Sequence, residues 1–358
     1  MDAPDVVAMM DAGPGRNGAS FATLSLDVQG GDFGLEVSIP AALQAISTDP
    51  RLNLILVGPR ELIQAALCKA GEREGPRLRV HHAPDTLPMD AKPTAVLRRG
   101  RDSSLWHALQ LVAEGEAGAC VSSGGTAALM TLGVRLVGLL PGIQRPALMA
   151  YVPTSRGHTG MLDLGANLNI HAGQLVQFAV MGSVTAEIAD RIQTPRVALL
   201  NVGHEDTKGH QVVREAHQAL KDLPLNYVGF IEGNDIFSGA VDIAVCDGFA
   251  GNLILKSAEG LVRLLIDELR NALDSGLASR LGAMLAGPAL RRELARLDPS
   301  AHNGAPLLGL NGVVVKSHGS ADVMAMTHAI LEAGREARRR VPEKIEAAIR
   351  AFHLEAEA

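Results

Sequence analysis

Short apolar runs that end in glycine and polar residues recur along the whole chain. The clearest lies at residues 241–256, where an apolar run ends in an Asp-Gly turn and a longer apolar segment follows. The run is rich in β-branched residues, as is typical of a strand that is buried on both faces of a parallel sheet. In the segment after it, leucine and isoleucine recur at the spacing of one broad helix face. The pattern therefore predicts a strand, a glycine-rich turn and a long helix.

About ten strand candidates of this kind alternate with segments of helical period. They lie at residues 21–28, 53–58, 78–82, 117–121, 147–153, 161–165, 196–203, 225–231, 241–246 and 311–316. Most end in Gly, Asp, Ser, Asn or His, which puts polar side chains at the carboxyl ends of the strands, where ligands bind in open α/β sheets. We therefore predict an α/β fold, a three-layer, doubly wound and mostly parallel sheet with its chemistry on one rim.

The domain boundaries follow from the same pattern. Residues 1–20 are small, polar and glycine-rich, and we expect a loose leader there. Gly13, Gly15 and Gly18 match GxGxxG, but no strand precedes them and no helix follows, so the context of a dinucleotide-binding motif is missing. We expect residues 21–345 to form a single large domain of two intertwined halves, with a helical protrusion at about residues 270–300.

Composition narrows the classes of partner. Aromatic residues make up only 3% of the 358 residues, which disfavours a nucleic-acid stacking surface, and the net charge of -6 leaves no global basic footprint. Cys68, Cys120 and Cys246 share no CxxC spacing, so we expect a reduced, cytoplasmic protein. Charges interrupt the longest apolar stretches, so no membrane span is predicted. The spacing of His81 and His82 does not indicate a metal site.

The polar residues after the strands suit the binding of an anion. Glycine-rich turns offer unobstructed backbone N–H groups and lysines supply positive charge, although an ordinary N-cap turn explains serine and threonine there equally well. The candidate substrate-binding residues are Gly30, Gly31, Asp32, Ser122, Ser123, Gly124, Thr126, Asp163, Asn167, Gly248, Gly251, Lys316, Ser320 and Asp322. The candidate catalytic residues are Lys208, Lys256, Asn252, His318, Asp235 and Asp247. A structural role remains an alternative for each of them.

Helical leucines lie beside arginines between residues 275 and 297. The arginines are Arg280, Arg291, Arg292 and Arg296. This segment is interpreted either as a helical hairpin in a dimer interface or as a basic, apolar surface for an acidic partner or a membrane, and both can hold.

Several long motifs in one order give the chain a family resemblance. They are MLDLGAN at 161–167, LVQFAVMGS at 175–183, GNDIFSG at 233–239, CDGFAGN at 246–252 and APLLGLNGVVVKSHGS at 305–320. With these motifs the chain resembles the bacterial phosphate acyltransferases, which convert acyl-acyl carrier protein and inorganic phosphate into acyl phosphate for phospholipid synthesis. It departs from the family pattern at Phe33, Gly125, Ala127, His302 and Ala321.

The resemblance implies a fold related to the phosphate acetyltransferases and to the isocitrate and isopropylmalate dehydrogenases. It also implies a homodimer without cofactor or metal that takes its acyl group from acyl carrier protein. Peripheral attachment to the membrane, or to a membrane glycerol-3-phosphate acyltransferase, belongs to the same expectation.

Attack of phosphate on a thioester needs stabilisation of negative charge more than acid–base catalysis, because phosphate is already an anion and a thiolate is a tolerable leaving group. Lysines and backbone N–H groups meet that need. Two other functions remain open: a metal- and nicotinamide-dependent dehydrogenase of the related fold, and a non-catalytic module that binds acyl carrier protein or lipid. A covalent route through Cys120 or Cys246 is disfavoured, because both lie in apolar strand runs where a buried cysteine is the usual finding.

Overall fold

One eleven-stranded sheet runs through the whole body of the protein. The computed structural model describes residues 21–276, 283–284, 286–287, 303–352 and 354. The strand order is β3-β2-β1-β4-β11-β10-β5-β6-β9-β7-β8. The strands are β1 (Ala22–Asp27), β2 (Leu52–Gly58), β3 (Leu78–His82), β4 (Ala119–Ser122), β5 (Ala147–Thr154), β6 (Gly157–Leu162), β7 (Val197–Leu200), β8 (Tyr227–Ile231), β9 (Ile243–Val245), β10 (Ala305–Leu308) and β11 (Val313–Lys316). The predicted α/β fold with a mostly parallel sheet is confirmed.

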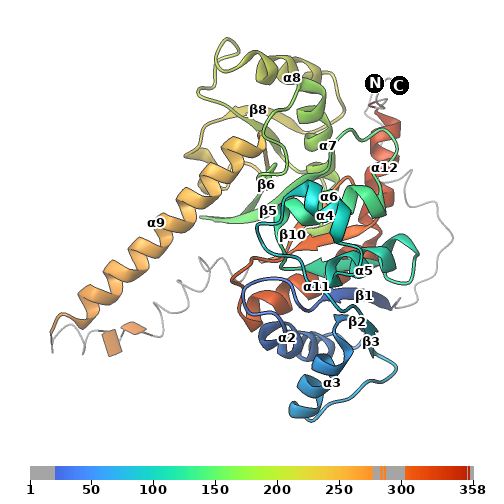
Figure 1. The fold of residues 1–358 in the computed structure, drawn as a ribbon. Helices are drawn as coiled ribbons and strands as arrows, with labels where there is room; N and C mark the ends of the chain where they lie inside the picture. Colours follow the sequence, from blue (N-terminus) through green and yellow to red (C-terminus); the bar gives the residue numbers. More distant parts are fainter. Residues whose placement is uncertain (1–20, 277–282, 285, 288–302, 353, 355–358) are drawn as a thin grey trace.

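Helices cover both faces of this sheet and complete the three layers (Figure 1). They are α2 (Leu35–Thr48), α3 (Arg60–Lys69), α4 (Pro93–Arg99), α5 (Ser104–Ala113), α6 (Thr126–Leu132), α7 (Ala172–Ala189), α8 (Gln211–Lys221), α9 (Gly248–Asp274), α11 (Val323–Arg339) and α12 (Val341–Ala351). Ile345 and Ile349 of α12 are buried, so the body continues past the expected end of the domain at residue 345.

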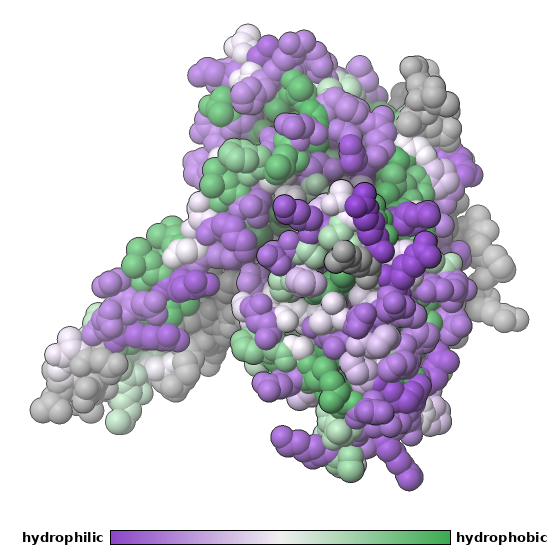
Figure 2. Space-filling view, in the orientation of Figure 1, coloured by the Kyte–Doolittle hydropathy of each residue, from purple (hydrophilic) through white to green (hydrophobic). Residues whose placement is uncertain are grey.

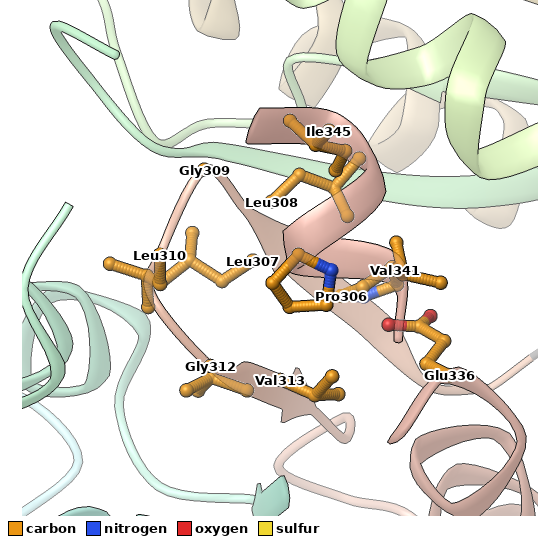
Figure 3. A pocket seen from close by; sticks show the side chains of 12 residues that line it. Pro306, Leu307, Leu308, Gly309, Leu310, Gly312, Val313, Glu336, Val341 and Ile345 are labelled. Carbon is orange, nitrogen blue, oxygen red and sulfur yellow. The ribbon is translucent and has the colours of Figure 1, made fainter. Parts of the chain in front are cut away.

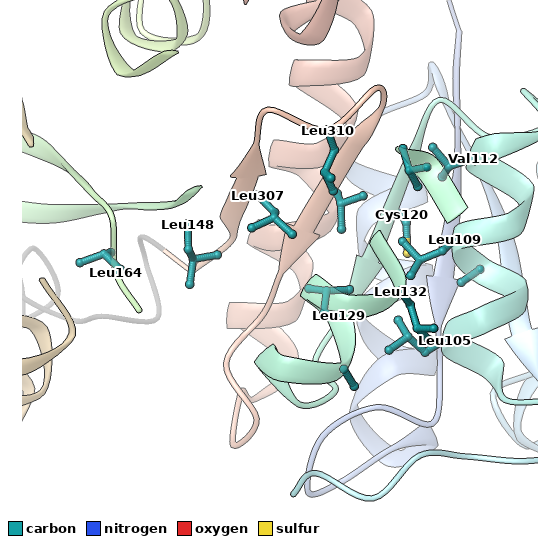
Figure 4. Packing of buried hydrophobic residues seen from close by; sticks show 14 of the residues in the cluster. Leu105, Leu109, Val112, Cys120, Leu129, Leu132, Leu148, Leu164, Leu307 and Leu310 are labelled. Atoms are coloured by element: carbon teal, nitrogen blue, oxygen red, sulfur yellow. The ribbon is translucent and has the colours of Figure 1, made fainter. Parts of the chain in front are cut away.

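Three clusters of buried apolar side chains form the core. One packs α2 and α11 against β1 and β2, and another packs α7 and α12 against the second half of the sheet. The third joins the two halves, because Leu148 and Leu164 lie in the same cluster as Leu109 and Leu129 (Figure 4). A cavity of about 10 Å³, the size of one water, lies between β10, β11 and α12, with Glu336 at its wall (Figure 3).

The two halves of the sheet run in opposite directions. β10 is antiparallel to both β11 and β5, and β5 is antiparallel to β6, while β6, β9, β7 and β8 are parallel to one another. The carboxyl ends of β1, β4 and β11 therefore lie at the opposite edge of the sheet from those of β6 and β9. The expectation of a single rim is wrong, because apolar periodicity locates strands without giving their direction.

Helix α9 leaves the body and extends well beyond it (Figure 1). Five of its apolar side chains are exposed over 56% to 65% of their surface, and Figure 2 shows apolar surface along this helix. These side chains are Phe249, Leu253, Leu261, Leu264 and Leu265. The expected protrusion at about residues 270–300 falls largely outside the described residues, and so does the expected leader at residues 1–20.

Candidate active site

The carboxylate of Asp27 lies at the centre of the first polar cluster. Asp27 is the last residue of β1 and is only 2% exposed. Its oxygens accept hydrogen bonds from the hydroxyls of Ser104 and Ser122, each at 2.6 Å, and from the backbone N–H of Gln29 at 3.3 Å. Ser122 Oγ in turn accepts the N–H of Gly124 at 2.9 Å. Asp27 thereby ties together the ends of β1 and β4 and the start of α5.

Three of the predicted turns, those after β1, β4 and β11, meet beside this carboxylate. Gly31 has a φ of 83°, and a Cβ there would lie 2.8 Å from the carbonyl oxygen of Gly319. The N–H of Asp32 donates to that same carbonyl at 2.9 Å. A Cβ on Gly30 would lie 2.7 Å from the backbone nitrogen of Gly124. Glycine is therefore required for the turns to approach one another this closely.

Lys316 supplies the positive charge among these turns. It ends β11 and is 8% exposed. Its ammonium donates hydrogen bonds to the carbonyl oxygens of Ser123, at 3.3 Å, and of Ser317. Burial lowers the pKa of Lys316 to about 8, and the positive charge of Lys256 adds to that shift. An ammonium has three protons to donate, so one remains for an anion.

His318 follows in the same turn. Its backbone N–H donates to Asn303 Oδ1 at 3.0 Å, and its Nδ1 accepts the backbone N–H of Ser320 at 3.3 Å and lies 2.9 Å from Ser320 Oγ. Because Nδ1 accepts, the neutral ring carries its proton on Nε2. Burial, followed by the charge of Lys256, lowers the pKa of His318, so the imidazole is neutral at pH 7. The Nε2–H group is then a donor for a substrate.

Two of the predicted carboxylates cap helices. Asp247 accepts the N–H of Ala250 at the start of α9, and Asp322 accepts the N–H of Ala325 at the start of α11, both at 2.8 Å. Each bond satisfies an N–H group that has no partner within its helix. In this structure both residues therefore hold helix ends.

Asp163 and Asn167 form a second polar cluster, at the carboxyl end of β6. The Asp163 carboxylate accepts the N–H groups of Leu148 at 2.9 Å, Ala166 at 3.1 Å and Asn167 at 2.6 Å, together with the Asn167 side-chain amide at 3.0 Å. The N–H of Gly248 donates to the Asn167 carbonyl at 2.8 Å. Four internal donors surround this carboxylate, so it fixes the start of α9 and leaves little capacity for a substrate.

The predicted residues on α9 connect this second cluster to the first. Asn252 is exposed near the start of the helix. Lys256, two turns in, makes an ion pair of 2.9 Å with Glu259 and does not turn back toward the start of α9. Its charge nevertheless lowers the pKa of both Lys316 and His318. Helix α9 therefore carries a positive charge from the second half of the sheet to the turns of the first half.

Lys208 and Asp235 lie apart from both clusters, in the loops after β7 and β8. Lys208 Nζ is 3.8 Å from Glu205 Oε1, and both side chains are more than half exposed. Asp235 accepts the backbone N–H of Glu232 at 2.9 Å and lies 3.5 Å from His204 Nε2. In the described part of the chain, these contacts stay within the two loops, so the structure does not bring Lys208 to Lys316.

Other sequence expectations concern cysteines, metal and membrane. Cys120 and Cys246 are buried, and burial raises the pKa of both thiols, which opposes their ionisation. Within the described residues, no three His, Cys, Asp or Glu side chains gather as a metal site, and no helix is both long and apolar enough to cross a bilayer. The arginines of the expected basic surface lie outside the described residues: Arg280, Arg291, Arg292 and Arg296.

Three residues of the first cluster were not predicted as site residues: Asp27, Ser104 and Asn303. Asp27 carries a sequence signal, because it is the last residue of a buried apolar strand. In the sequence, Ser104 resembles an ordinary N-cap residue. Asn303 lies in a segment without periodicity, and its side-chain amide donates to Ser317 Oγ at 2.8 Å. Only their contacts with distant segments show that they support the site.

Comparison with known proteins assigns the family. The model of the family described as "Fatty acid synthesis protein" matches residues 22–344. The chain belongs to this family. It is 49% identical over 324 residues to the phosphate acyltransferase of Alkalilimnicola ehrlichii, an alignment that covers 90% of this chain and 95% of that protein. It is 46% identical over 333 residues to the phosphate acyltransferase of Nitrosococcus oceani, with 93% and 96% covered.

Solved structures of other proteins share the fold of this fatty acid synthesis family member. A phosphotransacetylase from Streptococcus pyogenes aligns with a TM-score of 0.60 at 20% identity and covers 89% of this chain and 94% of its own. A 4-hydroxythreonine-4-phosphate dehydrogenase from Klebsiella pneumoniae aligns with a TM-score of 0.54 at 15% identity, with 89% and 100% covered. At these identities the likeness concerns the fold alone, and it confirms the expected similarity of fold to the phosphate acetyltransferases.

Proposed function

We propose that this chain transfers an acyl group from acyl carrier protein to inorganic phosphate and releases an acyl phosphate for phospholipid synthesis. The similarity to proteins named phosphate acyltransferase supports the activity. The observation that best supports a phosphate site is the buried ammonium of Lys316, which lies among the turns after β1, β4 and β11. A buried charge is unfavourable without a partner, and an anion bound at the turns is such a partner. The dehydrogenase and the non-catalytic module have no comparable support.

The chemistry follows from the charges at the site. A phosphate oxygen attacks the thioester carbonyl carbon, a C–O bond forms, and the C–S bond breaks with its electron pair going to sulfur. Lys316 and Lys256 offset the charge of phosphate and of the tetrahedral intermediate. Because the pKa of Lys316 is about 8, near the value of about 8.5 for a thiol, Lys316 can pass a proton to the leaving thiolate. His318 Nε2–H is a further donor to the oxyanion.

Apolar side chains at the rim of the site supply a surface for the acyl chain. Phe33, directly after the Asp32 turn, is 50% exposed, and Met324, in the first turn of α11, is 56% exposed. Phe249 and Leu253 lie in the first two turns of α9 and are also exposed. Exposed apolar groups beside polar turns suit a substrate with a charged head and an apolar chain.

The decisive assay incubates the protein with acyl-acyl carrier protein and phosphate, and traps the acyl phosphate with hydroxylamine. We expect hydroxamate that requires both substrates. Consumption of thioester without phosphate, or none at all, would refute the proposal. Omission of magnesium and nicotinamide from the reaction also separates this activity from that of a dehydrogenase.

The variant Lys316→Met tests the phosphate site. Because the folded-state pKa of about 8 lies below the ordinary value of 10.5 for a lysine, the charged lysine destabilises the fold at pH values below about 8. That destabilisation is on the order of 3 kcal/mol at most. We therefore expect Lys316→Met to lose at least a hundredfold in kcat/KM while keeping or raising its thermal stability. The matched control is Lys69→Met, an exposed lysine of α3, which should match the wild type in both measurements.

We also infer a homodimer in which α9 packs against its counterpart. The exposed Leu261, Leu264 and Leu265 lie along the part of α9 that leaves the body, where a second subunit would bury them. The double variant Leu261→Lys and Leu265→Lys should then elute as a monomer, with its mass measured by light scattering. A dimer of unchanged stability would exclude α9 as the interface.

A basic, apolar surface for acyl carrier protein or for an anionic membrane remains a prediction for residues 275–297. Reversal of Arg291 and Arg292 to Glu should weaken the capture of the donor or of anionic vesicles, and the wild-type interaction should fade with added salt. Splitting of the dimer without any change in either binding would assign the segment to the subunit interface.

A further inference from the structure

We propose that Asp27 is a positioning residue, whose buried negative charge keeps the ammonium of Lys316 charged and whose hydrogen bonds hold the turn around it. This inference rests on the proposed function, since it assigns Lys316 the phosphate. Asp27 is not expected to touch the substrate. It would act through Ser122 and through the electrostatic field at Lys316.

The hydrogen bonds of Asp27 favour its ionised form. The hydroxyls of Ser104 and Ser122 and the N–H of Gln29 all donate to its two oxygens, and the Gln29 N–H can only donate. Burial raises the pKa of Asp27, and the two serine hydroxyls, followed by the backbone N–H groups, oppose that shift. Hydrogen bonds donated to a carboxylate favour its charged form and so oppose the effect of burial.

A continuous chain of hydrogen bonds leads from this carboxylate to Lys316. The side chain of Ser122 donates to Asp27 at 2.6 Å, and the backbone carbonyl of Ser122 accepts the N–H of Ser317 at 2.9 Å. Ser317 adjoins Lys316, whose ammonium also donates to the carbonyl of Ser123 at 3.3 Å. A shift of Ser122 would therefore move both the backbone beside Lys316 and one acceptor of its ammonium.

The charges around Lys316 oppose one another. Burial and the ammonium of Lys256, on α9, favour loss of its proton, whereas the carboxylates of Asp27, on β1, and Asp32, on the following turn, favour its retention. His318, on the same turn as Lys316, is neutral at pH 7 and adds little to the charge around it. Asp32 is exposed and screened by solvent, but Asp27 is 2% exposed and is not. Asp27 is therefore the main buried counter-charge of Lys316.

The first experiment measures the pH dependence of kcat in the wild type, Asp27→Asn and Asp32→Asn. Asparagine keeps the size of the side chain and removes its charge. We expect the basic limb of the profile to move to lower pH by about one unit in Asp27→Asn, and by less in Asp32→Asn. An unchanged limb in a folded Asp27→Asn protein would overturn the inference, and so would an equal shift in the two variants.

The second experiment compares Ser122→Ala with Ser104→Ala. Each removes one 2.6 Å hydrogen bond to the same carboxylate and leaves its charge in place, but only Ser122 links Asp27 to Ser317. For a similar change in thermal stability, Ser122→Ala should lower kcat at least tenfold more than Ser104→Ala does. Equal kcat values would mean that Asp27 only stabilises the fold. This comparison stands even if Asp27→Asn does not fold.

The failure of this inference is distinct from the failure of the proposed function. Phosphate-dependent thioester consumption by the wild-type protein tests the function alone. If the wild type is active and the Asp27 variant keeps the wild-type pH limb, only the role of Asp27 is refuted.

Discussion

Substitution of Gly251 by alanine should damage the start of α9 more than its small size suggests. Gly251 is buried, and a Cβ there would lie 2.0 Å from the carbonyl oxygen of Asp163 and 3.0 Å from Cys246 Sγ. The first distance is more than 1 Å below an ordinary carbon–oxygen contact of about 3.4 Å. The backbone of one segment must therefore move, and Asp163 lies in the hydrogen-bonded cluster that fixes α9.

The size of this effect can be estimated. Overpacking of a well-packed site costs about 1–3 kcal/mol. With an unfolding entropy of about 2.1 cal/mol/K per residue, 1 kcal/mol corresponds to about 1.3 °C in Tm for a chain of this length. Gly251→Ala should therefore lower Tm by about 1–4 °C. It should also reduce turnover, because α9 carries Lys256 toward Lys316.

The matched control is Gly75→Ala. Residue 75 is exposed, a Cβ there meets nothing within 4 Å, and its φ lies outside the left-handed region. Its Tm should stay within about 1 °C of the wild type, as measured by circular dichroism under identical conditions. Equal Tm and equal turnover in the two variants would refute the close approach of α9 to Asp163.

Three further predictions concern titration and thiols. The rate should fall as pH rises above about 8, where Lys316 loses its proton. Lys256→Met should move this fall in rate to higher pH, because one source of the lowered pKa of Lys316 is gone. An unmoved fall in rate would contradict the approach of Lys256 to Lys316. Burial, with a neighbouring glutamate, raises the pKa of Glu336 well above 4.5, so its contribution to stability is complete below pH 4.5 and is lost as pH rises through the folded-state value. Glu336→Gln should therefore flatten this loss in denaturation midpoints measured between pH 4 and 9, and a slope equal to the wild type would count against it. Cys120→Ser and Cys246→Ser should retain the direct-attack activity, and an acyl adduct on either wild-type cysteine in mass spectra would sink that mechanism.

Local pattern was enough to predict most strands and the fold class. β2 and β3 lie within a residue of their predicted positions, since apolar runs bounded by glycine, proline and charged residues mark strands that are buried on both faces. β10 was not among the predicted strands, because it is four residues long and contains Pro306. The reversal of direction between the halves was also missed, because it depends on which strands pair.

The residues of the candidate site were likewise predicted only in part. The turns that hold Gly31, Ser122 and Lys316 were predicted from composition, and the structure brings them together. Lys208 looked equally suitable in the sequence, since it also follows a strand, but the structure leaves it beside Glu205. Asp27 was missed because a single acid at a strand end has no distinctive spacing, and its role depends on serines that are 77 and 95 positions away.

In the proposed reaction, the approach of α9 to the turns of the other half gives phosphate a role beyond that of a reactant. Lys256 and Lys316 are like charges on opposite halves of the sheet, so in the absence of an anion they repel each other. A bound dianion attracts both ammonium groups, which offsets their mutual repulsion and links the two halves electrostatically. Phosphate should therefore raise the Tm of the protein in a saturable manner, and the nucleophile itself would help to assemble the site before the acyl donor arrives.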